Sequence, residues 1–221
     1  ANATLSSGAT YVFNGTAAQV TSAFTTTPTA STVANMVINN AAGVTASASY
    51  NVTSALQLQT GILTLSTFNI TAASITGSPY SSTKMVNTNS TGMLGLLIPA
   101  GASNRLFPVG NGADYTPADY AFAANSDPRY LSVRAAKPRN TNDLSPTNYL
   151  DNRWWNTDLS LTTGSYTYTA SYTYITGDVA GSAAAIRLNR WTGSTWIDDP
   201  GSFVNTGLLT LNSSLLTQAS G

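Results

Sequence analysis

The sequence has no histidine, no cysteine and no glutamate, and its only lysines are Lys84 and Lys137. Without histidine there is no ordinary Ser-His or Cys-His nucleophile pair, and without histidine and cysteine there is no structural zinc site. The chain also lacks a Gly-x-Ser-x-Gly elbow, a phosphate-binding loop and a paired metal-binding motif. We therefore expect a protein that is not an enzyme and that holds no cofactor or metal.

Charged residues are also few. Nine basic and nine acidic residues leave the 221-residue chain with no net charge, whereas a nucleic-acid surface needs clustered Lys and Arg. No run of about 18 apolar residues occurs, so we expect no membrane-spanning helix. The opening residues Ala1, Asn2 and Ala3 have neither the positive nor the apolar region of a signal peptide. We interpret the chain as a mature exported protein located outside the cell.

The charges that do occur lie in one part of the chain, because none is found before Lys84. Residues 1–83 consist mainly of Thr, Ser, Asn, Gly and Ala, interrupted by single Val, Ile, Leu and Phe residues. This composition favours β-structure, and it lacks the charges with which soluble proteins keep exposed strand edges apart. Residues 61–77 in particular have high β-propensity with no charge and no proline, which is the signature of a strand that pairs with any open edge.

A loose repeat within the charge-free region predicts its fold. Gly43, Gly61 and Gly77 are 18 and 16 residues apart, and each follows or precedes a short apolar segment. One coil of a β-solenoid needs such a strand, glycine turn and second strand, although a β-sandwich fits the pattern equally well. Amide ladders inside a solenoid are a further expectation, from the asparagines near these turns, which are Asn39, Asn40, Asn51 and Asn69.

The second half predicts antiparallel structure. Residues 165–175 alternate tyrosine with threonine or serine, which is a strong strand pattern, and residues 186–197 indicate a hairpin with Trp191 and Trp196 on either side of its turn. The polar segment 125–153 indicates a long connection with one strand over 130–135. We thus expect an all-β fold: the region 1–92, in which Lys84 is the single charged residue, forms either a short β-solenoid or a sandwich, and an immunoglobulin-like antiparallel β-sandwich follows over 93–221.

Two adjacent tryptophans are the candidate glycan-contact residues. Trp154 and Trp155 must point to opposite faces of a strand, so at least one indole is expected to be partly exposed and able to contact a sugar. Arg134, Lys137 and Arg139 form a small basic group that either holds an anion or is a solvated edge neutralised by nearby aspartates. No local motif selects a pair of aspartates for glycoside hydrolysis or a calcium site.

A resemblance to a known class of proteins rests on several short phrases. They are Phe13 to Gln19, Ile38 to Ala41, and the FPVG segment Phe107 to Gly110 followed by Tyr115, Thr116 and Pro117. With them the chain resembles the secreted, repeat-containing, adhesin-like surface proteins of Bacteroidota that are type IX secretion substrates. The resemblance implies an extracellular location and supplies no catalytic residues.

Three functional classes remain on this reasoning. The first is a structural or adhesive cell-surface protein that assembles into a homopolymeric fibre, because charge-free strands pair without charged side chains. In that case we expect the segment Ala1 to Asn14 to insert as a strand into a neighbouring subunit, with Thr10, Tyr11, Val12 and Phe13 as the subunit contact. The alternatives are a carbohydrate-binding module that uses Trp154 or Trp155 on a surface glycan, and an aspartate-dependent glycan hydrolase.

Overall fold

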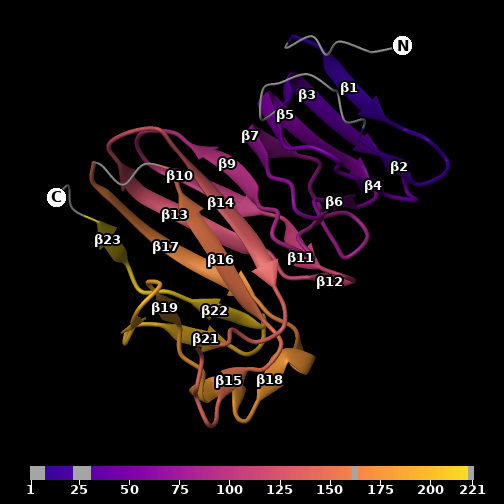
Figure 1. Ribbon diagram of the computed structural model, residues 1–221. Coiled ribbons are helices and arrows are strands. Elements are labelled where there is room, and N and C mark those ends of the chain that lie inside the picture. The colour runs from indigo at the N-terminus through magenta and orange to yellow at the C-terminus, as the bar shows by residue number, and fades with distance from the viewer. Residues whose placement is uncertain (1–7, 22–30, 161–163, 219–221) are drawn as a thin grey trace.

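The computed structural model describes residues 8–21, 31–160 and 164–218, and they form an all-β protein. Strands make up 52% of the described residues and helical turns 3%, so the prediction of an almost helix-free fold is confirmed. The helical residues described are two short 3-10 turns, Thr176–Asp178 and Ala183–Ala185. Figure 1 shows the first half stacked at one end of the molecule and the second half at the other.

The first half is a β-solenoid of about four turns. Each coil places one strand in a seven-stranded sheet and one short strand in a six-stranded sheet, and equivalent strands of successive coils pair in parallel. Of the two alternatives for residues 1–92, the solenoid is therefore correct. We call the first sheet the long sheet, with strands in the order β1 (Thr10–Phe13), β3 (Ser31–Asn39), β5 (Tyr50–Thr60), β7 (Ile70–Thr76), β9 (Leu94–Ile98), β14 (Arg129–Ala136) and β16 (Trp154–Leu159).

The second solenoid sheet, which we call the short-strand sheet, closes the other side of each coil. Its order is β2 (Gln19–Val20), β4 (Val44–Thr45), β6 (Leu63–Thr64), β8 (Val86–Asn87), β11 (Val109–Asn111) and β12 (Asp114–Tyr115). Only β12 is antiparallel to its neighbour. The solenoid thus ends at the β11–β12 hairpin.

The second half adds an antiparallel sheet, here called the cover sheet. It contains β10 (Ser103–Phe107), β13 (Ala118–Asn125), β17 (Tyr166–Thr173), β22 (Thr210–Asn212) and β21 (Phe203–Asn205), and β23 (Leu216–Gln218) also pairs with β17. Two small sheets complete the fold, β15 (Tyr149–Leu150) with β18 (Val179–Ala180) and β19 (Asn189–Trp191) with β20 (Trp196–Asp198). The expected strand over 165–175 and the expected hairpin over 186–197 are both present, while the immunoglobulin-like character of this half stays a prediction.

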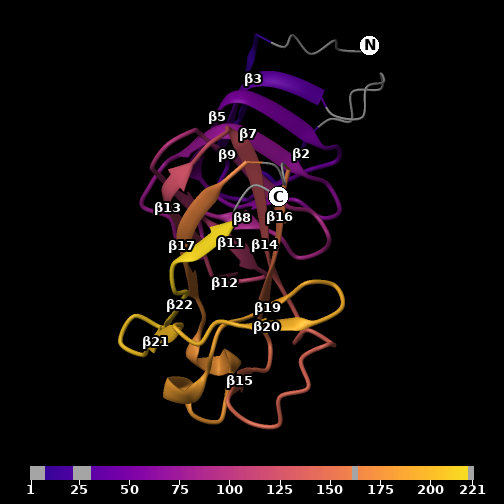
Figure 2. The same cartoon turned by 90° about the vertical axis from the view of Figure 1, so that its left-hand side faces the viewer.

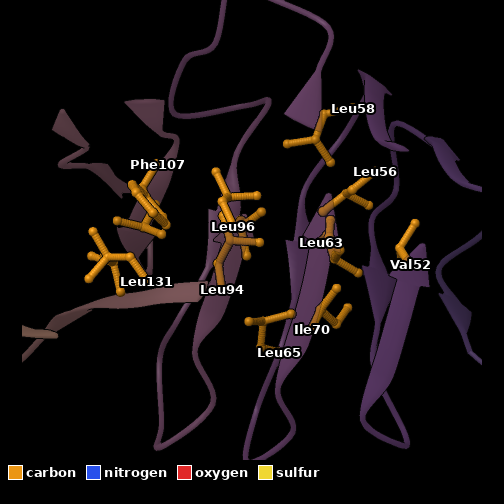
Figure 3. Close-up of a cluster of buried hydrophobic side chains, with 14 of the residues drawn as sticks. Val52, Leu56, Leu58, Leu63, Leu65, Ile70, Leu94, Leu96, Phe107 and Leu131 are labelled. Atoms are coloured by element: carbon orange, nitrogen blue, oxygen red, sulfur yellow. The ribbon is translucent and has the colours of Figure 1, made fainter. Parts of the chain in front are cut away.

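One hydrophobic core runs through both halves. Side chains at equivalent positions of paired strands stack into a column along the long sheet, from Val33 through Val52, Ala72, Leu96 and Leu131 to Leu159. The first five are buried, and the cover sheet adds Tyr120 and Phe122 to the same cluster. Figure 3 shows this interior from Val52 in the solenoid to Leu131 in the second half. The solenoid and the antiparallel part therefore fold as one body.

The predicted asparagines bridge the coils, but not as amide ladders. Asn40 is buried and donates to the carbonyl oxygen of Ala17 at 2.8 Å, while the side-chain oxygen of Asn69 accepts from the Met93 nitrogen at 2.9 Å. Asn51 accepts from the Thr71 hydroxyl at 3.2 Å, and Asn39 is exposed. Asn40 also donates to the Gln19 side-chain oxygen at 2.9 Å, whereas Asn51 and Asn69 bond to a hydroxyl or backbone group of the adjacent coil, so the four asparagines do not stack on one another.

At two of the three predicted glycine turns, Gly61 and Gly77, close backbone contact as well as backbone geometry requires glycine. Gly61 has a φ of +89°, and a β-carbon on it would lie 1.8 Å from the Asn40 carbonyl oxygen of the preceding coil. A side chain at positive φ alone costs about 1–2 kcal/mol. Gly101 is a matched comparison because its φ is +86° but nothing lies within 4 Å of an added β-carbon.

We therefore predict that Gly61→Ala lowers the free energy of unfolding by more than about 2 kcal/mol, whereas Gly101→Ala costs about 1 kcal/mol. Chemical denaturation of the two variants under the same conditions measures the difference. Equal losses would show that the coils can move apart at Gly61 without cost.

The FPVG segment marks the place where the chain crosses between sheets. Phe107 ends β10 in the cover sheet and Val109 begins β11 in the short-strand sheet, and the Pro108 carbonyl between them accepts from the Val86 nitrogen at 2.9 Å. Gly110 is buried, and a β-carbon there would lie 2.2 Å from the Asp114 carbonyl oxygen. The motif is thus explained by the end of the solenoid, without a ligand.

Candidate functional site

The solenoid begins with an open coil, and the main chain of β1 shows which groups are unpaired there. The Ala9 carbonyl oxygen accepts from the nitrogens of Ala34 and Asn35, so Ala9 faces β3. The main-chain N–H and C=O groups of successive strand residues alternate in direction. Those of Tyr11 and Phe13 therefore also point toward β3, and those of Thr10 and Val12 point away from it. Among the described residues no strand pairs with that outer edge of β1.

The short-strand sheet ends in the same way. The nitrogens of Gln19 and Thr21 donate to the carbonyl oxygens of Gly43 and Thr45, at 3.1 and 2.9 Å. The main-chain groups of Val20, between them, therefore point away from β4. Figure 1 shows β1 and β2 together at the end of the molecule that lies farthest from the cover sheet.

The side chains of this first coil carry no charge. Val12 is 51% exposed and Val20 62% exposed, which is unusual for valines within sheets. Tyr11 and Phe13 pack against the core but stay partly exposed, because no further coil covers them within the described residues. The Thr10 hydroxyl accepts from the Asn35 amide at 3.1 Å, so the hydrogen bonds between coils continue up to this last strand. An uncharged open edge of this kind favours strand addition.

Under the short-strand sheet, a polar side chain partly caps this end of the solenoid. Gln19 occupies the inward position that Val44, Leu63, Val86 and Val109 occupy in later coils. Its side-chain oxygen accepts from the Asn40 amide and from the Gly15 nitrogen, both at 2.9 Å. The core therefore ends in a polar residue under the short-strand sheet, whereas under the long sheet it ends in Tyr11 and Phe13.

The four predicted contact residues, Thr10, Tyr11, Val12 and Phe13, all lie in β1. The structure pairs this strand in parallel with β3 of its own chain, so one of its two edges is already used. Part of the predicted inserting segment, residues 1–7, lies outside the described residues. Contact with another subunit through β1 stays a prediction, and it now concerns the outer edge at Thr10 and Val12.

The far end of the long sheet is a second edge, and no strand of the described residues occupies it. The strands β1 to β9 in this sheet are parallel, β14 is antiparallel to β9, and β16 is antiparallel to β14. It follows that β16 runs in the same direction as β1. The Ser160 nitrogen donates to the Tyr130 carbonyl oxygen, so by the same alternation the main chain of Thr157 faces away from β14. Nothing in the sequence indicated that β16 is an end strand.

The tryptophans of β16 face opposite sides of the sheet, as expected. Trp155 packs against the core, with its ring 5.0 Å from that of Tyr172 and its indole nitrogen donating to the Thr116 carbonyl oxygen at 3.0 Å. Trp154 lies on the outer face, where the Arg134 guanidinium stands 5.1 Å from its ring centre. Both indoles already have protein partners, so neither is a freely exposed platform. Their role in glycan contact stays a prediction.

The expected basic group is neutralised by neighbouring acceptors. Arg134 donates to the Ser90 carbonyl oxygen at 2.7 Å, Lys137 pairs with Asp114, and Arg139 pairs with Asp143 at 3.1 Å. The segment 125–153 contains the expected strand, which is β14, and its residues Leu131, Val133 and Ala135 are buried. The group therefore matches a solvated edge better than an anion site.

A buried charge network joins the end of the solenoid to the second half. Arg153 is completely buried and donates to Asp178 at 2.9 Å, to Asp114 at 2.9 Å and to the Thr116 hydroxyl at 3.3 Å. Partial burial would raise the pKa of Asp114, but the hydrogen bonds from Lys137 and Arg153 outweigh it and hold that pKa below its usual range. The network is a structural connection, since each of its charges is paired within the chain.

The tyrosine face of β17 is part of the core. Tyr120 and Tyr172 share a hydroxyl hydrogen bond of 2.8 Å, and burial raises the pKa of both well above the usual value. Both therefore stay protonated near neutral pH. Within residues 8–21, 31–160 and 164–218 no three acidic side chains come close enough together to hold a metal ion.

Comparisons with known proteins identify no relative. No family model, no curated protein and no solved structure matches the chain. In the part of the chain that the structure describes, no helix is long and apolar enough to cross a membrane. Any assignment of function therefore depends on the geometry above.

Proposed function

We propose that the chain is a structural or adhesive subunit of an extracellular, cell-surface fibre, joined to further copies by strand addition. The outer edge of β1 in one copy receives the outer edge of β16 from the next copy. The long sheet would then continue from molecule to molecule, head to tail.

The observation that carries this proposal is the polarity of the long sheet. Its two end strands run in the same direction, and each has an edge that no described strand occupies. A β16 strand placed beside β1 would therefore pair in parallel, as every neighbouring pair in the solenoid part of this sheet does. A contact between two different surfaces of the same molecule repeats without closing, and it produces a filament.

The side chains support this pairing. The inward residues of β1 are Tyr11 and Phe13, and those of β16 include Trp155 and Leu159, so apolar side chains lie on the inner face at both ends. The outer edge of β1 contributes no charge to the contact, and main-chain hydrogen bonds supply affinity without charged side chains. In β16 the one charged side chain, Asp158, is exposed.

Sedimentation velocity and electron microscopy of the purified chain test the proposal. We expect the mass to rise with concentration over two orders of magnitude and the particles to be linear rods of increasing length. A single monomeric species over that whole range, with no rods in the images, would contradict the proposed function.

A further inference from the structure

The hairpin β19–β20 presents an aromatic face that differs from every other tryptophan site in the described residues. Its register pairs Trp191 with Trp196 and Asn189 with Asp198. Residues two apart on a strand share a face, so these four side chains lie together on one side of the hairpin. Figure 2 shows the hairpin at the periphery of the second half.

The two indoles are held in a fixed arrangement. Their ring centres are 5.2 Å apart with the planes inclined at 51°, and Trp196 is 39% exposed. The Trp196 indole nitrogen donates to the Asn142 carbonyl oxygen at 2.8 Å, which anchors the ring to the loop between β14 and β15. By contrast, Trp154 lies under Arg134 and Trp155 packs into the core.

Polar groups for orienting a ligand lie beside the indoles. In the amide orientation that satisfies both its oxygen and its nitrogen, Asn189 donates to the Asp198 carboxylate at 2.7 Å and to the Leu188 carbonyl oxygen at 3.1 Å. Both side chains are exposed, and within the described part of the chain Asp198 forms no ion pair with a basic residue. The face therefore offers the amide oxygen and the carboxylate as hydrogen-bond acceptors next to an apolar surface.

A cleft beside the hairpin is a poorer candidate. Arg190, Ile197 and Asp198 line it together with Tyr166 and Tyr168, but its volume is only about 100 Å³. Ligand pockets are typically about 300–1,000 Å³, so this cleft is too small to enclose a sugar ring. An exposed face needs no enclosing volume, because a sugar stacks on it from the outside.

We propose that the face formed by Trp191, Trp196, Asn189 and Asp198 binds a neutral, pyranose-based polysaccharide. The apolar face of a pyranose ring covers an indole, and its hydroxyl groups donate to the amide oxygen and the carboxylate. Because Asp198 is the one charged side chain on this face, an anionic sugar is disfavoured by like-charge repulsion. This inference does not depend on fibre formation, since β19 and β20 form a separate two-stranded sheet that contains neither β1 nor β16.

Titration with soluble neutral hexasaccharides of glucose, mannose and galactose, followed by calorimetry and by tryptophan fluorescence, tests the site. We expect at least one of them to bind and to change the fluorescence. Trp196→Ala should weaken that binding at least tenfold, Trp196→Tyr should retain most of it, and the matched control Trp154→Ala should leave it unchanged.

Asp198→Ala is a second variant that distinguishes loss of binding from loss of folding. Its side chain is exposed, and removing it leaves the indole pair in place. We expect it also to weaken binding, with an unchanged melting temperature. The proposal is overturned if none of the neutral hexasaccharides binds, or if binding survives in both Trp196→Ala and Asp198→Ala.

Discussion

Val12→Pro is expected to abolish assembly while leaving the subunit folded. The Val12 nitrogen faces away from β3, so a proline there removes a donor for which the described residues supply no strand partner and that an added strand would need. The proline ring also obstructs the approach of another strand to that edge. We expect a monomer at every concentration at which the unmodified chain forms rods.

The control for this variant is Val12→Thr, which retains the main-chain donor and the shape of the side chain. It should assemble like the unmodified chain. Because the position is exposed, the free energy of unfolding of both variants should lie within about 0.5 kcal/mol of that of the unmodified chain. Rods formed by Val12→Pro at the normal concentration would rule out pairing at the β1 edge.

Asp178→Ala is expected to produce the largest loss of stability. It leaves the buried Arg153 guanidinium without its buried partner and removes the bond to the Ile175 nitrogen at 3.2 Å. Breaking a buried ion pair by removing one partner costs about 3–5 kcal/mol. Chemical denaturation should show this loss, and the connection between the solenoid end and the second half should weaken with it.

The exposed pair Arg139 and Asp143 provides the comparison. Both side chains are partly exposed, at 22% and 25%, so Asp143→Ala should cost no more than about 1 kcal/mol. A double variant, Arg153→Met with Asp178→Leu, should recover part of the loss, since it removes both buried charges together. If Asp178→Ala costs as little as Asp143→Ala, the network does not hold the two halves together.

The sequence predicted those features of the fold that depend on local pattern. The spacing of Gly43, Gly61 and Gly77 predicted turns between short strands, in a solenoid or a sandwich, because each turn needs a residue that tolerates positive φ, and all three have it. Alternation over 165–175 predicted β17, and the turn between Trp191 and Trp196 predicted the outer hairpin. These patterns arise from neighbours in sequence, which a single chain displays directly.

Features that depend on distant contacts were not predictable in the same way. Asp114, Arg153 and Asp178 are far apart in the chain, and no spacing indicated that they meet in one network. Trp155 is covered by a bond to Thr116, 39 residues away, which no local pattern predicts. The parallel pairing of β1 with β3 in its own chain, and the position of β16 as the last strand, likewise follow only from the whole sheet order.

The most direct test of head-to-tail assembly is to mix two variants that each block one edge. Thr157→Pro should block β16 as Val12→Pro blocks β1, because the main chain of Thr157 also faces the open side. If β16 of one copy pairs with β1 of the next, each variant alone is a monomer, and an equimolar mixture forms a dimer and nothing longer. Rods formed by Thr157→Pro alone, or a mixture that stays entirely monomeric in sedimentation velocity, would contradict this account.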